Sequence, residues 1–100
     1  MAYRVIWSDE AVGDLERISQ FIGRDSGAYA RAVVRRVLEG TRKLETFPRM
    51  GRVVPELEDE DFRELLIYSF RVLYRVEGNT VTIAGVAHCK QSLRIDLDGL

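Results

Sequence analysis

Apolar and polar positions recur along the chain with two different periods, which divide it into extended and helical stretches. Residues 3–7 alternate with a period of two and are rich in β-branched and aromatic side chains, so they predict a strand. From residue 9 the apolar positions recur at spacings of three and four, as in an amphipathic helix that ends near Gly23. The predicted apolar face of this helix holds Ala11, Val12, Leu15, Ile18, Phe21 and Ile22.

A second helix is predicted over residues 28–46, after an Asp-Ser-Gly turn signal at residues 25–27. Ser8 before the first helix, and Asp25 or Ser26 before the second, have side chains that can cap the first backbone N–H groups. The predicted apolar face of the second helix holds Ala30, Val33, Val34, Val37, Leu38, Thr41 and Leu44. Two helices joined by so short a turn form an antiparallel hairpin that needs a surface to cover.

The second half of the chain returns to the period of strands. Strands are predicted over residues 62–68, 70–76 and 80–88, with turns at Ser69 and at the Glu-Gly-Asn of residues 77–79. The predicted inward positions are Phe70, Val72, Tyr74, Val76, Val81, Ile83 and Ala87, and the predicted solvated face carries Arg71, Leu73 and Arg75. The order predicts an α+β fold: an N-terminal strand, a helical hairpin and a three-stranded antiparallel meander, with the helices on one face of an antiparallel sheet.

The join between the two halves, residues 47–56, contains both prolines. Pro48 is expected to stop the preceding helix, because proline fixes φ and lacks a backbone donor. Gly51 stands between Arg49 and Arg52 and permits a turn that a residue with a Cβ resists. The join is therefore predicted to display two guanidinium groups around one sharp bend.

The composition indicates one soluble domain over residues 1–100, with 46% hydrophobic and 31% charged residues. Cys89 is the only cysteine and His88 the only histidine, so neither an internal disulfide nor a metal site is expected, and no cofactor motif is present. The N-terminus lacks a signal sequence and no apolar run approaches the roughly 20 residues that span a bilayer, so a cytoplasmic location without membrane contact is expected. Trp7 and Phe47 are predicted to pack in the core.

Charge is arranged in blocks although the formal net charge is only -1. Residues 9–26 hold five acids and two bases, residues 27–55 hold two acids and seven bases, and residues 56–64 hold six acids and one base. Such blocks favour a partner with complementary charge over uniform coating of a nucleic acid.

Basic residues from the join, the strands and the chain after the last strand form the candidate binding surface: Arg49, Arg52, Arg63, Arg71, Arg75 and Lys90. Arginine grips phosphate with two parallel hydrogen bonds, and Tyr68, Phe70 or Tyr74 could stack on a base. The alternative, with about equal weight for each arginine, is that it only solubilises the sheet and pairs with a nearby acid. His88 is the candidate for acid–base chemistry, against the commoner structural role of a lone histidine, and Cys89 lacks an adjacent base to make it a nucleophile.

The order of several short motifs carries a family resemblance. The motifs are Tyr-Arg-Val-Ile-Trp-Ser at 3–8 leading into Glu-Ala at 10–11 and Asp-Leu at 14–15, Phe-Pro-Arg-Met-Gly-Arg at 47–52, Arg-Glu-Leu at 63–65, Phe-Arg-Val-Leu-Tyr-Arg-Val at 70–76 and Val-Ala-His at 86–88. Together they resemble the RelE/ParE superfamily of toxins from bacterial type II toxin-antitoxin systems. The resemblance implies growth inhibition, and neutralisation by a cognate antitoxin in a hetero-oligomer. The antitoxin is expected to contact the helical hairpin and the sheet edge, with arginines such as Arg71 and Arg75 meeting its acidic side chains.

The family divides by target: RelE-like members cleave mRNA in the ribosome, whereas ParE-like members poison DNA gyrase. If the chain is a RelE-like ribonuclease, the resemblance implies that Arg71 corresponds to a phosphate-contacting arginine, and Lys90 and His88 are further catalytic candidates. Phe62 and Glu64 stand where those enzymes carry lysines, and no tyrosine follows His88. The long hairpin and the join are closer to the ParE-like branch.

The resemblance therefore implies a plasmid-stabilization type of toxin that inhibits DNA gyrase without catalysis. Its predicted binding residues are Arg49, Arg52, Arg63, Arg71, Tyr74 and Arg75. A ribosome-dependent mRNA endoribonuclease and a non-toxic binding module are the two alternatives.

Overall fold

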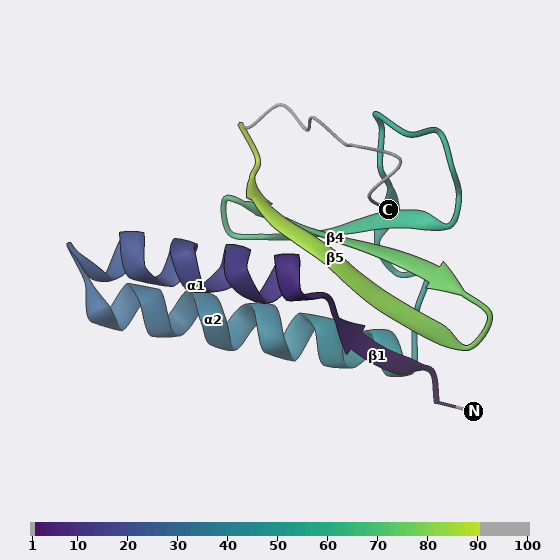
Figure 1. Cartoon of the computed structure of the whole chain (residues 1–100), viewed down its shortest axis with the longest axis horizontal. Coiled ribbons are helices and arrows are strands. Elements are labelled where there is room, and N and C mark those ends of the chain that lie inside the picture. The colour runs from purple at the N-terminus through teal and green to yellow at the C-terminus, as the bar shows by residue number, and fades with distance from the viewer. Residues whose placement is uncertain (1, 91–100) are drawn as a thin grey trace.

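A helical hairpin lies against one face of a five-stranded sheet in the computed structural model, which describes residues 2–90 (Figure 1). The elements are β1 (Arg4–Trp7), α1 (Asp9–Gly23), α2 (Gly27–Arg42), the 3₁₀-helix η1 (Lys43–Glu45), β2 (Arg52–Val53), β3 (Phe62–Ile67), β4 (Phe70–Glu77) and β5 (Thr80–His88). This order confirms the predicted α+β fold with both helices on one side of the sheet. No helix in the described part of the chain is both long and apolar enough to cross a bilayer.

The sheet has the strand order β1-β5-β4-β3-β2 and is mixed, so the prediction of a purely antiparallel sheet is wrong. β1 pairs with β5 in parallel, while the other three pairs are antiparallel. The chain passes through both helices and the strands β2 to β4 before β5 runs beside β1 in the same direction. Parallel pairing requires such a long connection, because a tight hairpin joins only antiparallel strands. The join also contributes a strand of its own, because Arg52 and Val53 pair with Glu64 and Arg63.

Both helices begin at a serine cap. The Ser8 hydroxyl accepts a hydrogen bond from the Ala11 N–H at 3.1 Å, and the Ser26 hydroxyl accepts one from the Tyr29 N–H at 3.0 Å. Each serine satisfies a backbone donor that the first helical turn leaves open. The structure thus selects Ser26 over Asp25 as the cap of α2.

The end of α2 differs from the prediction. α2 stops at Arg42 and tightens into η1, whereas the sequence predicted one helix to residue 46. The last turn narrows just before Pro48, and the Phe47 N–H still bonds to the Lys43 carbonyl at 2.9 Å. A tighter final turn of this kind is common where a helix meets a proline.

The core lies between the hairpin and the inner face of the sheet, and its central side chains are Val33, Val37, Leu44, Leu65, Val72, Tyr74, Val81 and Ile83. Trp7 packs against this core, as predicted. Phe47 was expected there as well, and that prediction is wrong because its side chain follows the last helical turn and is 62% exposed. Val12, Phe21 and Leu38 are also exposed, since the sheet covers only one side of each helix.

A β-bulge in β5 changes which residues face the core. The register shifts between Leu73 and Tyr74, and Ala84 has no partner in the β4 ladder. Beyond the shift Val86 is buried in the core cluster, whereas Ala87 pairs with Arg71 on the other face. The prediction of Ala87 as an inward residue is wrong because it assumed an unbroken alternation, which one inserted residue inverts.

The start of α1 covers the edge of β5 where β1 has ended. The Ser8 hydroxyl donates to the Ala84 carbonyl at 3.3 Å, and one carboxylate oxygen of Asp14 accepts from the Val86 N–H at 3.0 Å. The other oxygen of Asp14 pairs with Arg17. Backbone groups of β5 beyond the end of β1 therefore find side-chain partners in α1 and its cap, and this edge of the strand is protected.

Candidate functional site

Four charged side chains form a network on the outer face of the sheet, which is the face opposite the helices: Arg52, Glu56, Glu64 and Arg71. Glu64 is 1% exposed and Arg71 is 6% exposed. The prediction that Arg71 lies on a solvated face is therefore wrong. Charged groups are buried only when they are paired and hydrogen-bonded, so the contacts within this network determine what it can do.

Every nitrogen of the Arg71 guanidinium meets a carboxylate. Nε donates to Glu64 Oε1 at 2.7 Å, while Nη1 and Nη2 donate to the two oxygens of Glu56, both at 2.8 Å. The second oxygen of Glu64 accepts from Arg52 Nε. Two arginines and two glutamates thus close a network with no net formal charge. Such fork-to-carboxylate contacts are among the stronger and more directional pairs in proteins.

The ion pair shifts the pKa values of both Arg71 and Glu56. Hydrogen bonding to Glu56 is the main cause that raises the pKa of Arg71, and hydrogen bonding to Arg71 is the main cause that lowers the pKa of Glu56. Burial acts against both shifts, because it disfavours charge. Both groups therefore stay ionised at neutral pH.

Acidification is expected to weaken the Glu56–Arg71 pair. The pKa of Glu56 is lower in the folded protein than its ordinary value of 4.5. The pair therefore stabilises the fold fully at a pH above the pKa of Glu56 in the unfolded chain, and this contribution disappears as the pH falls through the lower pKa of the folded protein. Thermal unfolding from neutral pH to about pH 3 should show a smaller acid-induced loss of stability in Glu56→Gln than in the wild type. The matched Glu58→Gln variant should follow the wild type, and an equal loss in all three proteins would contradict the assignment.

Arg49 and Arg63 hold the join against the loop that follows it. Arg63 Nε donates to the Glu60 carbonyl and Nη1 donates to the Gly51 carbonyl, both at 2.9 Å. Arg49 pairs with Asp61 at 2.9 Å, and this hydrogen bond is the main cause that raises the pKa of Arg49. These two predicted binding residues therefore already have partners in their own chain, and the exposed Arg49 pair adds little stability.

Tyr74 and Arg75 lie on opposite faces of β4. Tyr74 is 1% exposed in the core, and its hydroxyl accepts the Gly51 N–H at 3.0 Å, so its ring is covered in this structure. Burial is the main cause that raises the pKa of Tyr74. Arg75 pairs with Glu77 at 2.8 Å and lies 5.4 Å from the centroid of the Phe62 ring. Of these two predicted binding residues, only Arg75 lies on the outer face.

The three residues predicted for a ribonuclease are not gathered around one space. The His88 ring packs edge-on against Phe70 on the inner face, at a centroid distance of 5.6 Å, and its Nδ1 accepts the Lys90 backbone N–H at 3.1 Å. Arg71 follows Phe70 in β4 and so points to the outer face. Within residues 2–90 no group of three histidine, cysteine or acidic side chains could hold a metal ion.

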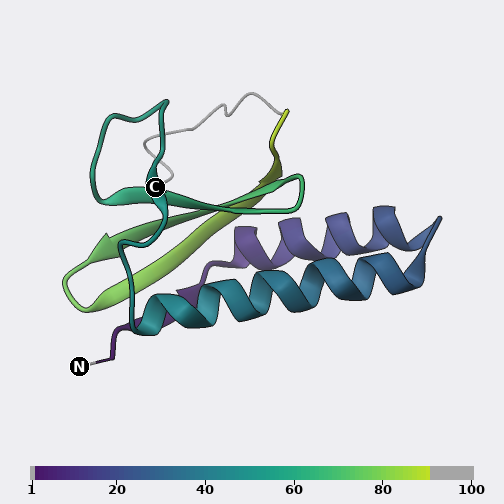
Figure 2. The same ribbon diagram turned by 180° about the vertical axis from the view of Figure 1, so that it is seen from behind.

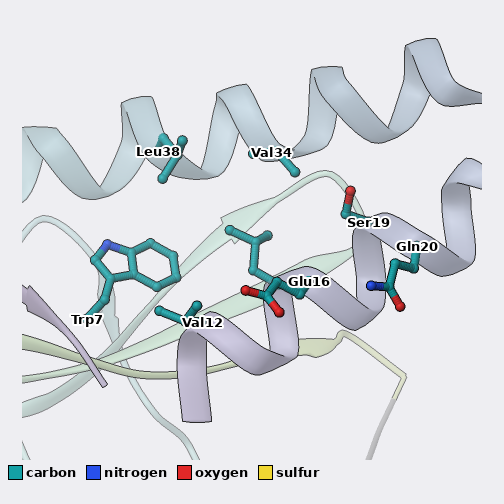
Figure 3. Close-up of a pocket in the computed structure, with 8 residues that line it drawn as sticks. Trp7, Val12, Glu16, Ser19, Gln20, Val34 and Leu38 are labelled. Atoms are coloured by element: carbon teal, nitrogen blue, oxygen red, sulfur yellow. The ribbon is translucent and has the colours of Figure 1, made fainter. Parts of the chain in front are cut away.

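A groove with a volume of about 490 Å³ runs along the outside of the helical hairpin, between α1 and α2 (Figure 3). It is lined by Trp7, Val12, Leu15, Glu16, Ser19, Gln20, Val34 and Leu38. Figure 3 shows the Trp7 ring at one end, with Ser19 and Gln20 of α1 toward the other. We call this feature the hairpin groove, and it combines an apolar floor with a polar rim.

The sequence reasoning missed both the hairpin groove and the glutamates of the network. It assigned Val12, Val34 and Leu38 to the buried faces of the helices, whereas Val12 is 41% exposed and Leu38 47% exposed. In the sequence, Glu64 stands out only as a departure from the lysine pattern of the ribonucleases. A strand position that alternates with apolar residues and carries an acid, as Glu64 does, was the one available signal that the outer face of the sheet holds a buried charge.

Residues 5–93 match the family described as the ParE toxin of the type II toxin-antitoxin system parDE. The chain belongs to the ParE toxin family. The match spans both helices and every strand except the first residue of β1. No curated relative matches the sequence.

Two solved structures share the ParE-family fold seen in this chain. One is described as a chromosomal ParDE toxin-antitoxin system from P. aeruginosa, with a TM-score of 0.72, 22% identity, and coverage of 87% of this chain and 96% of that chain. The other is the RelBE2 toxin-antitoxin complex of Mycobacterium tuberculosis, with a TM-score of 0.60, 22% identity, and coverage of 88% and 92%. At this identity the likeness concerns the fold.

Proposed function

We propose that this ParE-family toxin inhibits bacterial growth by binding DNA gyrase without catalysing a reaction, and that a cognate antitoxin neutralises it. The observation that carries the proposal is that the Arg71 guanidinium is occupied by Glu56 and Glu64. Metal-free cleavage of a phosphodiester depends on positive charge aimed at the developing negative charge. A neutral network in this position supports a protein-binding role, and the family match supports gyrase as the protein that is bound.

Purified toxin is expected to inhibit supercoiling of a relaxed plasmid by DNA gyrase in the presence of ATP. The same preparation should leave mRNA intact in a translation system with active ribosomes. Normal supercoiling at saturating toxin would contradict the gyrase target. Ribosome-dependent mRNA cuts that disappear in Arg71→Ala would favour the endoribonuclease. If neither activity appears and expression leaves growth unchanged, the non-toxic binding module is the better description.

The hairpin groove is the surface that we propose for an apolar segment of the antitoxin. Both similar structures are described as toxin-antitoxin assemblies, which supports an antitoxin as the partner. The groove offers exposed Val12 and Leu38 beside the Trp7 ring, and burial of such side chains by an amphipathic segment provides affinity. Glu16, which also lines the groove, can pair with a basic residue of that segment and so fix the position of the segment along the groove.

Leu38→Asp is expected to weaken binding of the cognate antitoxin at least about tenfold, because an unpaired carboxylate would be buried in the groove. The fold should tolerate the change, since Leu38 is 47% exposed. Phe21→Asp is the matched control, because Phe21 is an exposed apolar residue of the hairpin that does not line the groove. Calorimetric titration should show a loss for Leu38→Asp only. Unchanged binding by Leu38→Asp would place the antitoxin elsewhere, and equal losses for both variants would contradict a contact specific to the groove.

A further inference from the structure

The Glu56 carboxylate forms a two-pronged contact with the guanidinium of Arg71, as a bound carboxylate ligand would. Both of its carboxylate oxygens accept hydrogen bonds, one from Nη1 and one from Nη2 of Arg71. The residue comes from the loop between β2 and β3, which extends away from the helices (Figure 2). Its partner Arg71 belongs to a strand of the sheet, whereas Glu56 itself lies on a loop.

The network has a fixed part and an exchangeable part. Glu64 and Arg71 belong to adjacent strands, and their side chains are 0% and 7% exposed. Glu56 and Arg52 are the members that reach solvent, with side chains 37% and 57% exposed. A carboxylate at the position of Glu56 can therefore be replaced from solution while Glu64 Oε1 keeps Arg71 in place through Nε at 2.7 Å and Nη2 at 2.6 Å.

The charges favour an acidic replacement. Without the Glu56 carboxylate the network keeps two arginines and one glutamate, so its net formal charge changes from zero to +1. Arg71 would then present Nη1 and the remaining N–H of Nη2, which also pairs with Glu64, and the spacing of these two donors matches a carboxylate. Arg52 donates through Nε to the Glu64 carboxylate that also holds Arg71, so its positive charge lies beside Arg71.

We propose that Glu56 covers a carboxylate-binding site formed by Arg71 and Arg52, from which an acidic side chain of a protein partner displaces it. The inference rests on the proposed function in that the partner is the antitoxin. Glu56 is then an internal competitor, and the apparent affinity for the partner's acid is lowered in proportion to the fraction of molecules with the site open. A partner segment without a suitably placed carboxylate leaves the Glu56–Arg71 pair intact, so the exchange also selects partners.

A labelled hexaglutamate peptide is the probe, and fluorescence anisotropy measures its binding to the full chain. Glu56→Gln should bind it at least about tenfold more tightly than the wild type, as expected if the site is open in roughly a tenth of wild-type molecules or fewer. Glu58→Gln removes the same charge from the same loop at an exposed position without an ion pair among the described residues. It should stay within about twofold of the wild type, which separates the specific site from general electrostatic attraction.

Arg71→Lys in the Glu56→Gln background localises the site. Lysine keeps a cation beside Glu64 but lacks the two-pronged donor, so the gain in affinity should be lost. Equal binding by Glu56→Gln and Glu58→Gln, or a gain that survives Arg71→Lys, would overturn the proposal. So would binding of inorganic phosphate, and not of hexaglutamate, by Glu56→Gln.

The peptide assay requires neither gyrase nor antitoxin, so it separates the site from the proposed function. Tight binding of hexaglutamate by Glu56→Gln, together with normal gyrase supercoiling, would retain the carboxylate site and reject the gyrase target. Inhibited supercoiling without any gain in peptide affinity would do the reverse.

Discussion

Glu64→Ala is expected to lower the free energy of unfolding by about 3 kcal/mol, more than any surface substitution in this chain. The Glu64 side chain is 0% exposed and receives hydrogen bonds from both Arg71 and Arg52. Its removal leaves the guanidinium of Arg71 buried with Glu56 as its one remaining carboxylate. An incompletely paired buried charge costs more than the pair itself contributes. Urea unfolding at neutral pH, followed by circular dichroism, measures the difference.

The double variant Glu64→Met/Arg71→Met tests the cause of that loss. It removes both buried charges and replaces them with apolar side chains of similar volume, which is often neutral or stabilising. It should recover most of the stability that Glu64→Ala loses. If the double variant is as unstable as Glu64→Ala, the loss comes from packing on the outer face and the charge explanation is wrong.

Gly51→Ala is expected to destabilise the fold by roughly 3 kcal/mol or more, at the upper end of the cost of overpacking. A Cβ at this position would lie 2.5 Å from the Glu64 carbonyl oxygen and 2.7 Å from the Tyr74 hydroxyl oxygen. The first of these atoms belongs to the backbone of β3 and cannot move without breaking the β2–β3 pairing. The second accepts the Gly51 N–H, so the displacement also weakens a buried hydrogen bond.

Gly13→Ala is the matched control for Gly51→Ala. A Cβ at Gly13 in α1 would meet only the guanidinium of Arg17, at 3.3 Å, and that side chain is 70% exposed and can move. Because alanine favours a helix interior over glycine, this variant should gain about 0.5–1 kcal/mol. The two variants should therefore differ by several kcal/mol in the same unfolding experiment. Similar stabilities would show that the join can shift to accept a side chain.

The structure gives Gly51 a different role from the one that the sequence predicted. The sequence suggested that Gly51 supplies a backbone conformation that other residues resist. In the described part of the chain, the residues with positive φ are Glu58, Tyr68 and Gly78. Gly51 instead allows the backbone of β3 and the Tyr74 hydroxyl to approach it closely. Such a contact joins segments far apart in sequence and leaves no local signal.

Three of the candidate binding arginines are already paired within their own chain. Arg49, Arg63 and Arg71 are all candidate binding residues in the sequence, yet each donates to a carboxylate or a carbonyl of its own chain. Their first role is to hold the join, the loop and the strands together. Binding of a partner through them therefore means exchange of existing contacts, which makes Glu56 as important for partner selection as the arginines.

Much of the fold could be predicted from local patterns. The period of three and four fixed the two helices, the period of two fixed the strands, and Ser8 marked the start of α1. These signals are local because a helix or strand must present one apolar face whatever covers it.

The tertiary structure alone decided the candidate site. Alternation assigns Glu64 and Arg71 to faces of their strands, but only the register of β3 against β4 and the course of the loop bring Glu56 and Glu64 to one guanidinium. The parallel β1–β5 pair and the bulge at Ala84 likewise depend on contacts across the chain. The sequence by itself determined the elements and the family resemblance, because these follow from periodicity and short motifs. Which charges neutralise one another depends on long-range pairing, which no local pattern records.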